Sequence, residues 1–219
     1  MPPPRIAPSI LAADFTRLGA QVAEVVDAGA RIIHVDIMDG HFVPTLSMGP
    51  QVLSALRDLD LGVEFDVHLM VERPERFVAD FASAGADAIT VHAEATPHVH
   101  YAVQRIRELG CRAGVAVCPS TPLAIYGELD VDRALCMTVN PGWGGQAFIP
   151  GSPDRIRRLR ALLGDEPDLE VDGGIDASTA GPSAAAGATL FVAGSAVFGA
   201  PDPATAYAEI AAAAGCSQP

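Results

Sequence analysis

The chain has 219 residues, a formal net charge of −13 and a hydrophobic fraction of 49%. This length suits one large domain with a sizeable core. The acidic balance argues against a nucleic-acid partner, because phosphate backbones are bound by basic surfaces. No apolar run approaches the roughly 20 residues that cross a bilayer, and the N-terminus lacks the features of a secretion signal. We therefore expect a cytoplasmic protein with no membrane partner.

β-rich segments alternate with helical patterns along the chain. The predicted strands span residues 6–10, 31–37, 63–69, 86–92, 112–117, 134–139, 168–172 and 188–193. The predicted helices lie near 14–28, 49–58, 74–84, 98–109, 121–129, 152–163, 176–186 and 203–214. This alternation predicts an α/β fold, a (β/α)8 TIM barrel, as a single domain over residues 1–219. An open doubly wound sheet is the alternative, but its Gly-rich first turn is missing.

Two kinds of residue mark the helix boundaries. Gly29, Gly85 and Gly187 each stand where a helix is expected to end before the next strand. Pro182 falls inside the seventh helical pattern. We expect that helix to start after Pro182 or to be kinked there.

The basic residues and the cysteines further limit the reactions and the cross-links that this chain can support. All 14 Lys and Arg positions are arginine, which excludes Schiff-base chemistry and lysine acid–base roles. The cysteines do not resemble a disulfide framework. Cys111, Cys118 and Cys136 fall in or beside predicted strands, where we interpret them as small buried hydrophobes.

Polar and sulfur-containing side chains gather at the predicted strand ends, where barrel enzymes carry their active sites. These residues are Ser9, His34, Asp36, Met38, His68, Met70, His92, Met137 and Asp172. Strand alternation puts His34, Asp36 and Met38 on the same face of their strand, and it likewise puts Asp66, His68 and Met70 on the same face of theirs.

Four of these residues are candidate metal ligands: His34, Asp36, His68 and Asp172. Burying such groups unpaired would cost roughly several kcal/mol per charge, and a divalent metal is the simplest compensation. A lone histidine in a strand is more often structural, but four donors from three strands favour a metal site. Mixed imidazole and carboxylate ligation suits Zn²⁺, Fe²⁺, Mn²⁺ or Co²⁺.

Gly-rich segments follow the last three strands, at residues 140–146, 172–175 and 193–199. Each alone could be an ordinary tight turn. Together, at adjacent strand ends, they favour a phosphate site built from backbone N–H groups. A metal-polarised carbonyl flanked by Asp36 and Asp172 suggests proton abstraction beside a carbonyl, with the aspartates as acid and base.

Seven motifs resemble the ribulose-phosphate 3-epimerase family in order along nearly the whole chain. They are SILAAD (9–14), HVDIMDGHFVP (34–44), DVHLMV (66–71), TVHAEAT (90–96), NPGWGGQ (140–146), VDGGI (171–175) and VAGSAVFG (192–199). The resemblance implies a metal-dependent epimerase that inverts C3 of D-ribulose 5-phosphate to give D-xylulose 5-phosphate. It would act through an enediolate in the pentose phosphate and Calvin pathways.

The resemblance also implies roles for individual residues. His34, Asp36, His68 and Asp172 would bind one divalent metal ion, and Asp36 and Asp172 would be catalytic. The substrate, a small phosphorylated sugar, would contact Ser9, His68, Gly142, Trp143, Gly144, Gly145, Asp172, Gly173, Gly174, Gly194 and Ser195. Met38, Met70 and Met137 would surround the reacting carbons, although barrel core is an equally good interpretation. Family members form oligomers, so a homo-oligomer is expected.

Three positions depart from the common family pattern: Thr45, Cys118 and Trp143. None is a proposed ligand or acid–base residue, but Thr45 and Trp143 could alter the fit of the sugar. The nearest alternative is therefore D-allulose-6-phosphate 3-epimerase. A decarboxylase of the orotidine-phosphate type would need the absent lysine. The non-enzyme alternative is a catalytically silent sugar-phosphate sensor, which would be expected to have lost one of the four ligands.

Overall fold

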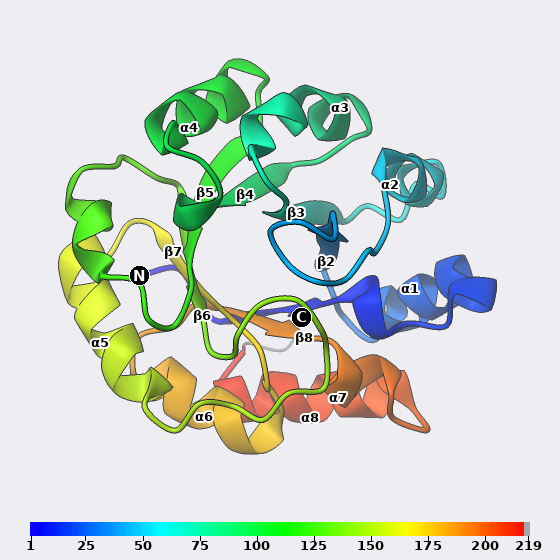
Figure 1. Cartoon of the computed structure of the whole chain (residues 1–219). Helices are drawn as coiled ribbons and strands as arrows, with labels where there is room; N and C mark the ends of the chain where they lie inside the picture. Colours follow the sequence, from blue (N-terminus) through cyan, green and yellow to red (C-terminus); the bar gives the residue numbers. More distant parts are fainter. Residues whose placement is uncertain (217–219) are drawn as a thin grey trace.

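The computed structural model describes residues 1–216, and its centre is a ring of eight parallel strands (Figure 1). The strands are β1 (Arg5–Pro8), β2 (Ile32–Met38), β3 (Glu64–Met70), β4 (Ala88–His92), β5 (Arg112–Val117), β6 (Arg133–Met137), β7 (Asp168–Asp172) and β8 (Leu190–Ala193). They pair in the order β1-β8-β7-β6-β5-β4-β3-β2. A parallel bridge between Ser9 and His34 joins β1 to β2 and completes the ring. The predicted TIM barrel is confirmed, and the doubly wound alternative is wrong.

Helices surround the strands. The α-helices are α1 (Leu18–Asp27), α2 (Pro50–Arg57), α3 (Val78–Ser83), α4 (Val99–Glu108), α5 (Ser152–Leu163), α6 (Ala177–Ala185), α7 (Ser195–Phe198) and α8 (Pro203–Ala214). The 3₁₀ helices are η1 (Ile10–Ala12), η2 (Phe15–Arg17), η3 (Pro74–Arg76), η4 (Ala93–Ala95) and η5 (Leu123–Gly127). Within residues 1–216, no helix combines the length and the apolar character needed to cross a membrane.

Two helix predictions need correction. The helix expected over 121–129 is only the short 3₁₀ helix η5, which follows Pro122 and ends at Gly127. The expectation that the seventh helix begins after Pro182 is also wrong, since α6 begins at Ala177 and contains Pro182. A capping box between Asp176 and Thr179 fixes that start. The predicted glycine helix ends are confirmed: Gly29, Gly85 and Gly187 have φ of 113°, 103° and 108°.

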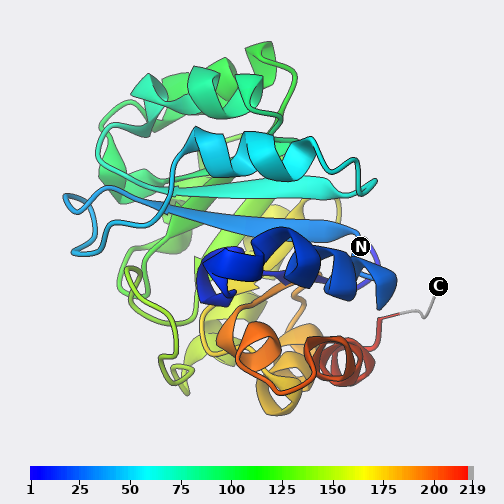
Figure 2. The ribbon, with the colours of Figure 1, turned by 90° about the vertical axis from the view of Figure 1, so that its right-hand side faces the viewer.

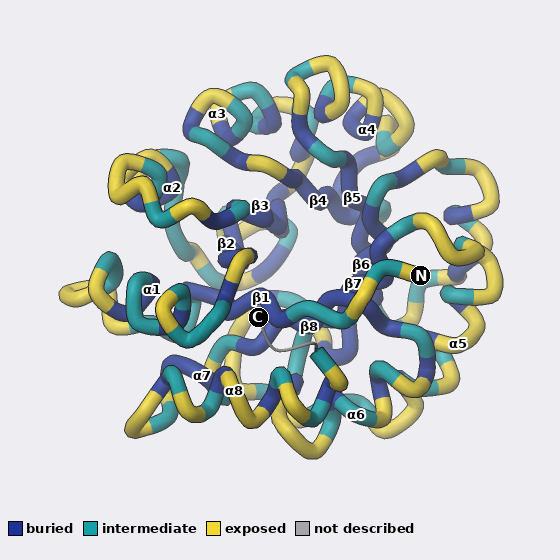
Figure 3. Tube along the Cα trace, turned by 180° about the vertical axis from the view of Figure 1, so that it is seen from behind, coloured by how far each residue is buried: buried dark blue, intermediate teal, exposed yellow. Residues whose placement is uncertain are grey.

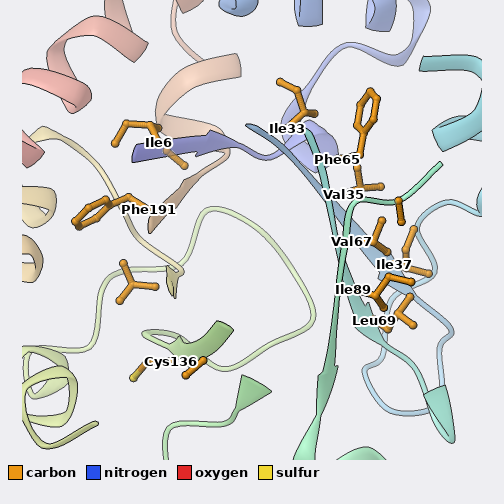
Figure 4. Close-up of a cluster of buried hydrophobic side chains, with 14 of the residues drawn as sticks. Ile6, Ile33, Val35, Ile37, Phe65, Val67, Leu69, Ile89, Cys136 and Phe191 are labelled. Atoms are coloured by element: carbon orange, nitrogen blue, oxygen red, sulfur yellow. The ribbon is translucent and has the colours of Figure 1, made fainter. Parts of the chain in front are cut away.

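An apolar layer between the strands and the helices forms the main core. Alternate residues of β2 and β3 point outward into it, among them Ile33, Val35, Phe65 and Val67 (Figure 4). Nearly all strand residues are buried, and none is exposed, whereas exposed residues lie on the outer helices and the loops (Figure 3). The remaining residues of each strand face the barrel axis. The long loop after β2 lies at the opposite end of the barrel from the N-terminus (Figure 2).

Candidate active site

A cavity of about 360 Å³ opens at the carboxyl ends of the strands. Its lining contains most of the predicted site residues: Ser9, Asp36, Met38, Met70, Met137, Gly142, Trp143, Gly144, Gly145, Asp172, Gly173, Gly174, Gly194 and Ser195. The predicted ligands His34 and His68 are fully buried and contact the lining residue Asp36. The barrel thus brings together residues that are far apart in the sequence.

His34, Asp36, His68 and Asp172 form a compact cluster, in which one donor atom of each lies within 4.8 Å of the others. Oδ1 of Asp36 lies 3.3 Å from His34 Nε2 and 3.0 Å from His68 Nδ1. His68 Nδ1 is also 3.8 Å from Oδ2 of Asp172. The hydroxyl of Ser9 donates a 2.6 Å hydrogen bond to Oδ2 of Asp36. Ser9 therefore lines the cavity but also orients an aspartate, a role that the sequence did not predict.

Strand register explains why these donors meet. Asp36 of β2 pairs with His68 of β3, and Met38 pairs with Met70 one inward-facing step further along. Asp172 is the last residue of β7. Because alternate residues of a strand share a face, all of these side chains point to the barrel axis at its carboxyl end.

The cluster has strongly perturbed acid–base properties. Burial alone would lower the pKa of His34, but Asp36 and other carboxylates raise that pKa well above its usual value. Burial would raise the pKa of Asp36, but His34 and His68 hold it well below its usual range. For Asp172, burial and the charge of Asp36 both raise the pKa, to about 7. Burial lowers the pKa of His68 to about 4. Two carboxylates thus oppose each other in a buried space, a situation that a cation would relieve.

The donor set fits a divalent metal ion. It offers two imidazole nitrogens and two carboxylates, which suit first-row transition metals. His34 Nε2 is buried without a hydrogen-bond partner. A buried nitrogen aimed at Asp36 and left unsatisfied is costly unless an ion or a proton occupies the space between them. These four residues could therefore hold a metal.

Behind His34 lies a buried charge network that the sequence analysis did not predict, although it placed Asp66 on the same face of its strand as His68. His34 Nδ1 is 2.8 Å from Asp66 Oδ2 and 3.4 Å from Glu170 Oε1. A carboxylate on the far nitrogen of a ligand histidine fixes its tautomer and ring orientation. Asp66 and Glu170 precede His68 and Asp172 by two positions, so they share the inward face of β3 and β7. That period of two was the signal that could have identified them.

Arg133 compensates these buried acids. Its guanidinium, 1% exposed, pairs with Asp66, and Nη2 lies 3.2 Å from Glu64 Oε1 and 3.5 Å from Asp168 Oδ2. Its Nε lies 4.0 Å from Glu170 Oε2. Burial and the charge of Asp66 raise the pKa of Glu170 to about 8. The barrel axis beneath the cluster is therefore charged rather than apolar.

His92 extends the cluster on its other side. Its Nε2 lies 2.9 Å from Nε2 of His68, while its Nδ1 lies 3.3 Å from Glu94 Oε2 and 3.7 Å from Cys118 Sγ. Glu94 accepts hydrogen bonds from the backbone N–H of Cys118 at 2.7 Å and from the Thr121 hydroxyl. His92 was expected at the rim, but neither its contact with His68 nor its two other partners followed from the sequence.

The Gly-rich loops approach the cavity closely. Gly173 and Gly174 have φ of 114° and 65°. A Cβ on Gly173 would lie 2.2 Å from Val139, and one on Gly174 would lie 2.5 Å from the backbone nitrogen of Phe148. These two positions therefore require glycine for both conformation and space. Their backbone groups line the cavity without covering side chains.

The methionines and the divergent positions are placed as follows. Met38 and Met70 share a small buried cluster with Val43, and Met137 belongs to another, yet all three methionines also line the cavity. The three methionines are thus packed in the core and also line the cavity, while their place around the reacting carbons stays a prediction. Trp143 lines the cavity and is 52% exposed. Thr45 is not among the lining residues.

Comparison with known proteins agrees with this geometry. Residues 5–198 match the model of the "Ribulose-phosphate 3 epimerase family". A ribulose-phosphate 3-epimerase of Serratia marcescens is 50% identical over 90% of this chain and 96% of that protein. One from Bacillus subtilis is 45% identical over 94% of this chain and 97% of that protein.

Among solved structures, orotidine 5'-phosphate decarboxylase from Pyrococcus horikoshii superposes with a TM-score of 0.73 at 19% identity, covering 97% of this chain and all of that one. This likeness concerns the barrel alone. The family match spans residues 5–198, a range that contains the cluster of His34, Asp36, His68 and Asp172, and the two relatives cover 90% and 94% of this chain. The chain belongs to the ribulose-phosphate 3-epimerase family, a family of isomerases.

Proposed function

We propose that this protein interconverts D-ribulose 5-phosphate and D-xylulose 5-phosphate by inverting C3 with the help of one divalent metal ion. One observation carries the proposal: a single cavity joins Asp36 and Asp172, in a cluster with two histidines, to the glycines of the last three strand ends. The cluster of aspartates and histidines suits proton transfer beside a carbonyl. The glycines of the strand ends suit the binding of a phosphate. A small sugar phosphate needs both within a few ångströms.

Asp36 and Asp172 would move the protons. Inversion at one carbon needs a group that removes a proton from one face and a group that returns a proton to the other. Both aspartates line the cavity, and they come from β2 and β7. Ser9 holds Asp36 in place through its 2.6 Å hydrogen bond.

His34, Asp36, His68 and Asp172 would hold the metal, with Zn²⁺, Fe²⁺, Mn²⁺ and Co²⁺ as candidates. When bound, a divalent ion would supply positive charge for the oxygen that becomes negative as the proton leaves C3. Asp66, through His34, would keep that imidazole oriented for ligation. Met38, Met70 and Met137 would exclude water from the reacting carbons.

The phosphate would be bound by backbone groups rather than by cationic side chains. Among residues 1–216, no arginine lines the cavity, and the only acidic residues in its lining are Asp36 and Asp172. Gly173, Gly174 and Gly194 present uncovered backbone there, beside Ser195. Backbone N–H groups can bind a phosphate without a basic residue. We therefore place the sugar phosphate with its phosphate toward β7 and β8.

The test is proton NMR of the purified, metal-loaded protein with D-ribulose 5-phosphate in D₂O. We expect xylulose 5-phosphate with deuterium at C3, and no exchange after chelation of the metal. D-allulose 6-phosphate is measured in parallel. Faster turnover of the six-carbon sugar would overturn the choice of substrate. No exchange on either sugar with any of the four metals would overturn the reaction itself.

A further inference from the structure

Cys118, His92 and Glu94 form a second group of donor atoms that the proposed reaction does not use. His92 ends β4, Glu94 lies in η4 directly after it, and Cys118 follows β5. One donor atom of each lies within 4.8 Å of the other two. His92 Nδ1, the atom that faces away from His68, is the centre of the group.

The spacing of these donors resembles a tetrahedral zinc site. Zinc bond lengths imply edges of about 3.4 Å between nitrogen and oxygen ligands and about 3.6 Å between nitrogen and sulfur ligands. Here His92 Nδ1 lies 3.3 Å from Glu94 Oε2 and 3.7 Å from Cys118 Sγ. Glu94 is exposed and Cys118 is half-buried, so water can reach the fourth position.

We propose that Cys118, His92 and Glu94 bind a thiophilic divalent ion, such as Zn²⁺, at a site distinct from the cluster of His34, Asp36, His68 and Asp172. The two sites share no ligand and differ in chemistry, because only this one offers a thiolate. Thiolate ligands favour soft ions over hard ones. The thiolate therefore shifts the preference of this site toward soft ions such as Cd²⁺ and Zn²⁺ and away from harder ions such as Mn²⁺.

The surroundings are preorganised for such an ion. Oε1 of Glu94 is held by the N–H of Cys118 and the hydroxyl of Thr121, which leaves Oε2 directed to His92. Arg155 donates to the backbone carbonyls of Cys118 and Thr121 and so fixes the loop. A bound ion would displace the thiol proton of Cys118 and lie beside the Glu94 carboxylate.

The 2.9 Å contact between His92 Nε2 and His68 Nε2 couples the two sites. A metal on His92 Nδ1 places the remaining ring proton on Nε2, directed at His68. His68 then accepts that hydrogen bond and carries its own proton on Nδ1, the atom nearest Asp36 and Asp172. Filling one site therefore weakens the other, on the order of tenfold for a coupling of ordinary size. The test therefore starts from metal-free protein and continues until added Cd²⁺ produces no further change.

The experiment is a titration of metal-free protein with Cd²⁺, followed by the ultraviolet charge-transfer absorption of the cadmium–thiolate bond. This signal is blind to a site without sulfur ligands. We expect one such band per chain at saturation, lost in Cys118→Ser and retained in Cys216→Ser, which removes the other half-buried thiol. Glu94→Gln should retain the band but raise the Cd²⁺ concentration at half-saturation at least about tenfold.

Circular dichroism and thermal unfolding establish that each variant is folded, and Glu94→Gln tests the site with its thiol intact. Absence of the band from the wild-type protein, or its persistence in Cys118→Ser, would overturn the proposal. So would equal Cd²⁺ affinity in the wild type and Glu94→Gln. None of these results depends on turnover, so the site stands or falls separately from the proposed reaction.

Discussion

The two faces of the same strands carry opposite chemistry. Toward the helices, β2 presents Ile33 and Val35 to a continuous apolar layer (Figure 4). Toward the axis, the same strand presents His34 and Asp36, both buried and both charged or polar. Apolar burial supplies most of a fold's stability, whereas buried charge is costly unless it is paired. The period of two lets one strand serve stability on one side and chemistry on the other.

The first prediction concerns Asp172, on the side of the strands that faces the barrel axis, where it lines the cavity. Asp172→Asn should reduce turnover on the order of 10²- to 10⁴-fold, because an acid–base group is removed. The fold should remain intact, since the outer layer is untouched. Steady-state kinetics and thermal unfolding of the variant and of Asp154→Asn, an exposed control, check this. Near-normal turnover would remove Asp172 from the acid–base pair.

The second prediction concerns Arg133, on the side of the strands that faces the barrel axis, beneath the cluster of His34, Asp36, His68 and Asp172. Arg133→Met removes the buried cation shared by the carboxylates of Glu64, Asp66, Asp168 and Glu170 and should lower the free energy of unfolding by about 3–5 kcal/mol. Denaturant unfolding measures this loss. Arg157→Met, whose ion pair lies on the surface, should cost less than about 1 kcal/mol. Equal losses in both variants would contradict the compensating role of Arg133.

The third prediction addresses the outer face. Phe65 is 1% exposed and lies in the apolar layer. Phe65→Ala should destabilise the protein by about 3–5 kcal/mol through lost burial and a cavity, with turnover per folded molecule unchanged. Leu162→Ala, at an exposed leucine, should change stability by no more than about 0.5 kcal/mol. A selective loss of turnover in Phe65→Ala would show that the two faces are not separable.

The smallest effect is expected at a helix outside both faces. Asp176 caps α6, and hydrogen bonds from Ser178 and Thr179 hold the pKa of its carboxylate below the usual 3.8. Asp176→Ala should cost about 1 kcal/mol at neutral pH. Because the folded-state pKa is depressed, this contribution is present above pH 3.8 and disappears as pH falls through the lower folded-state value.

Unfolding measured across that pH range would reveal the convergence of the two proteins. Glu209→Ala, at an exposed position of α8, is the control and should show no comparable difference. A pH-independent gap between the wild type and Asp176→Ala would mean that the cap does not act through its ionised carboxylate.

Much of the barrel and the convergence of His34, Asp36, His68 and Asp172 could be predicted because both follow from local patterns. Alternation and glycine helix ends marked the βα units, and ligand-type residues at the ends of β2, β3 and β7 converge by topology alone. The prediction of a helix over 121–129 was wrong, because the apolar pattern there resembles that of a full helix, whereas the structure forms only η5 between Pro122 and Glu128. Pro182 misled because the capping box between Asp176 and Thr179 starts α6 before the proline, which therefore lies inside the helix.

The contacts between strands could not be predicted. The approach of His92 to His68 depends on the register and ring orientation of two neighbouring strands, and the meeting of Cys118 with Glu94 depends on two loops. The pairing of Arg133 with Asp66 likewise joins β6 to β3 across the axis of the barrel. Such contacts depend on side-chain conformation in three dimensions, which periodicity does not encode.

The junction between β1 and β2 is the least hydrogen-bonded one in the ring of strands, and it lies beside the cluster of His34, Asp36, His68 and Asp172. In the described chain, β1 and β2 share an isolated bridge, Ser9 to His34, where the other neighbouring pairs share continuous ladders. The backbone there should open more often than elsewhere in the ring. A metal ion bound by His34 and Asp36 on β2 and by Asp172 on β7 would connect the strands on the two sides of that junction. Amide hydrogen exchange at β1 and β2 should therefore slow when the cluster is occupied, so that the chemistry of the cavity also regulates how tightly the barrel is closed.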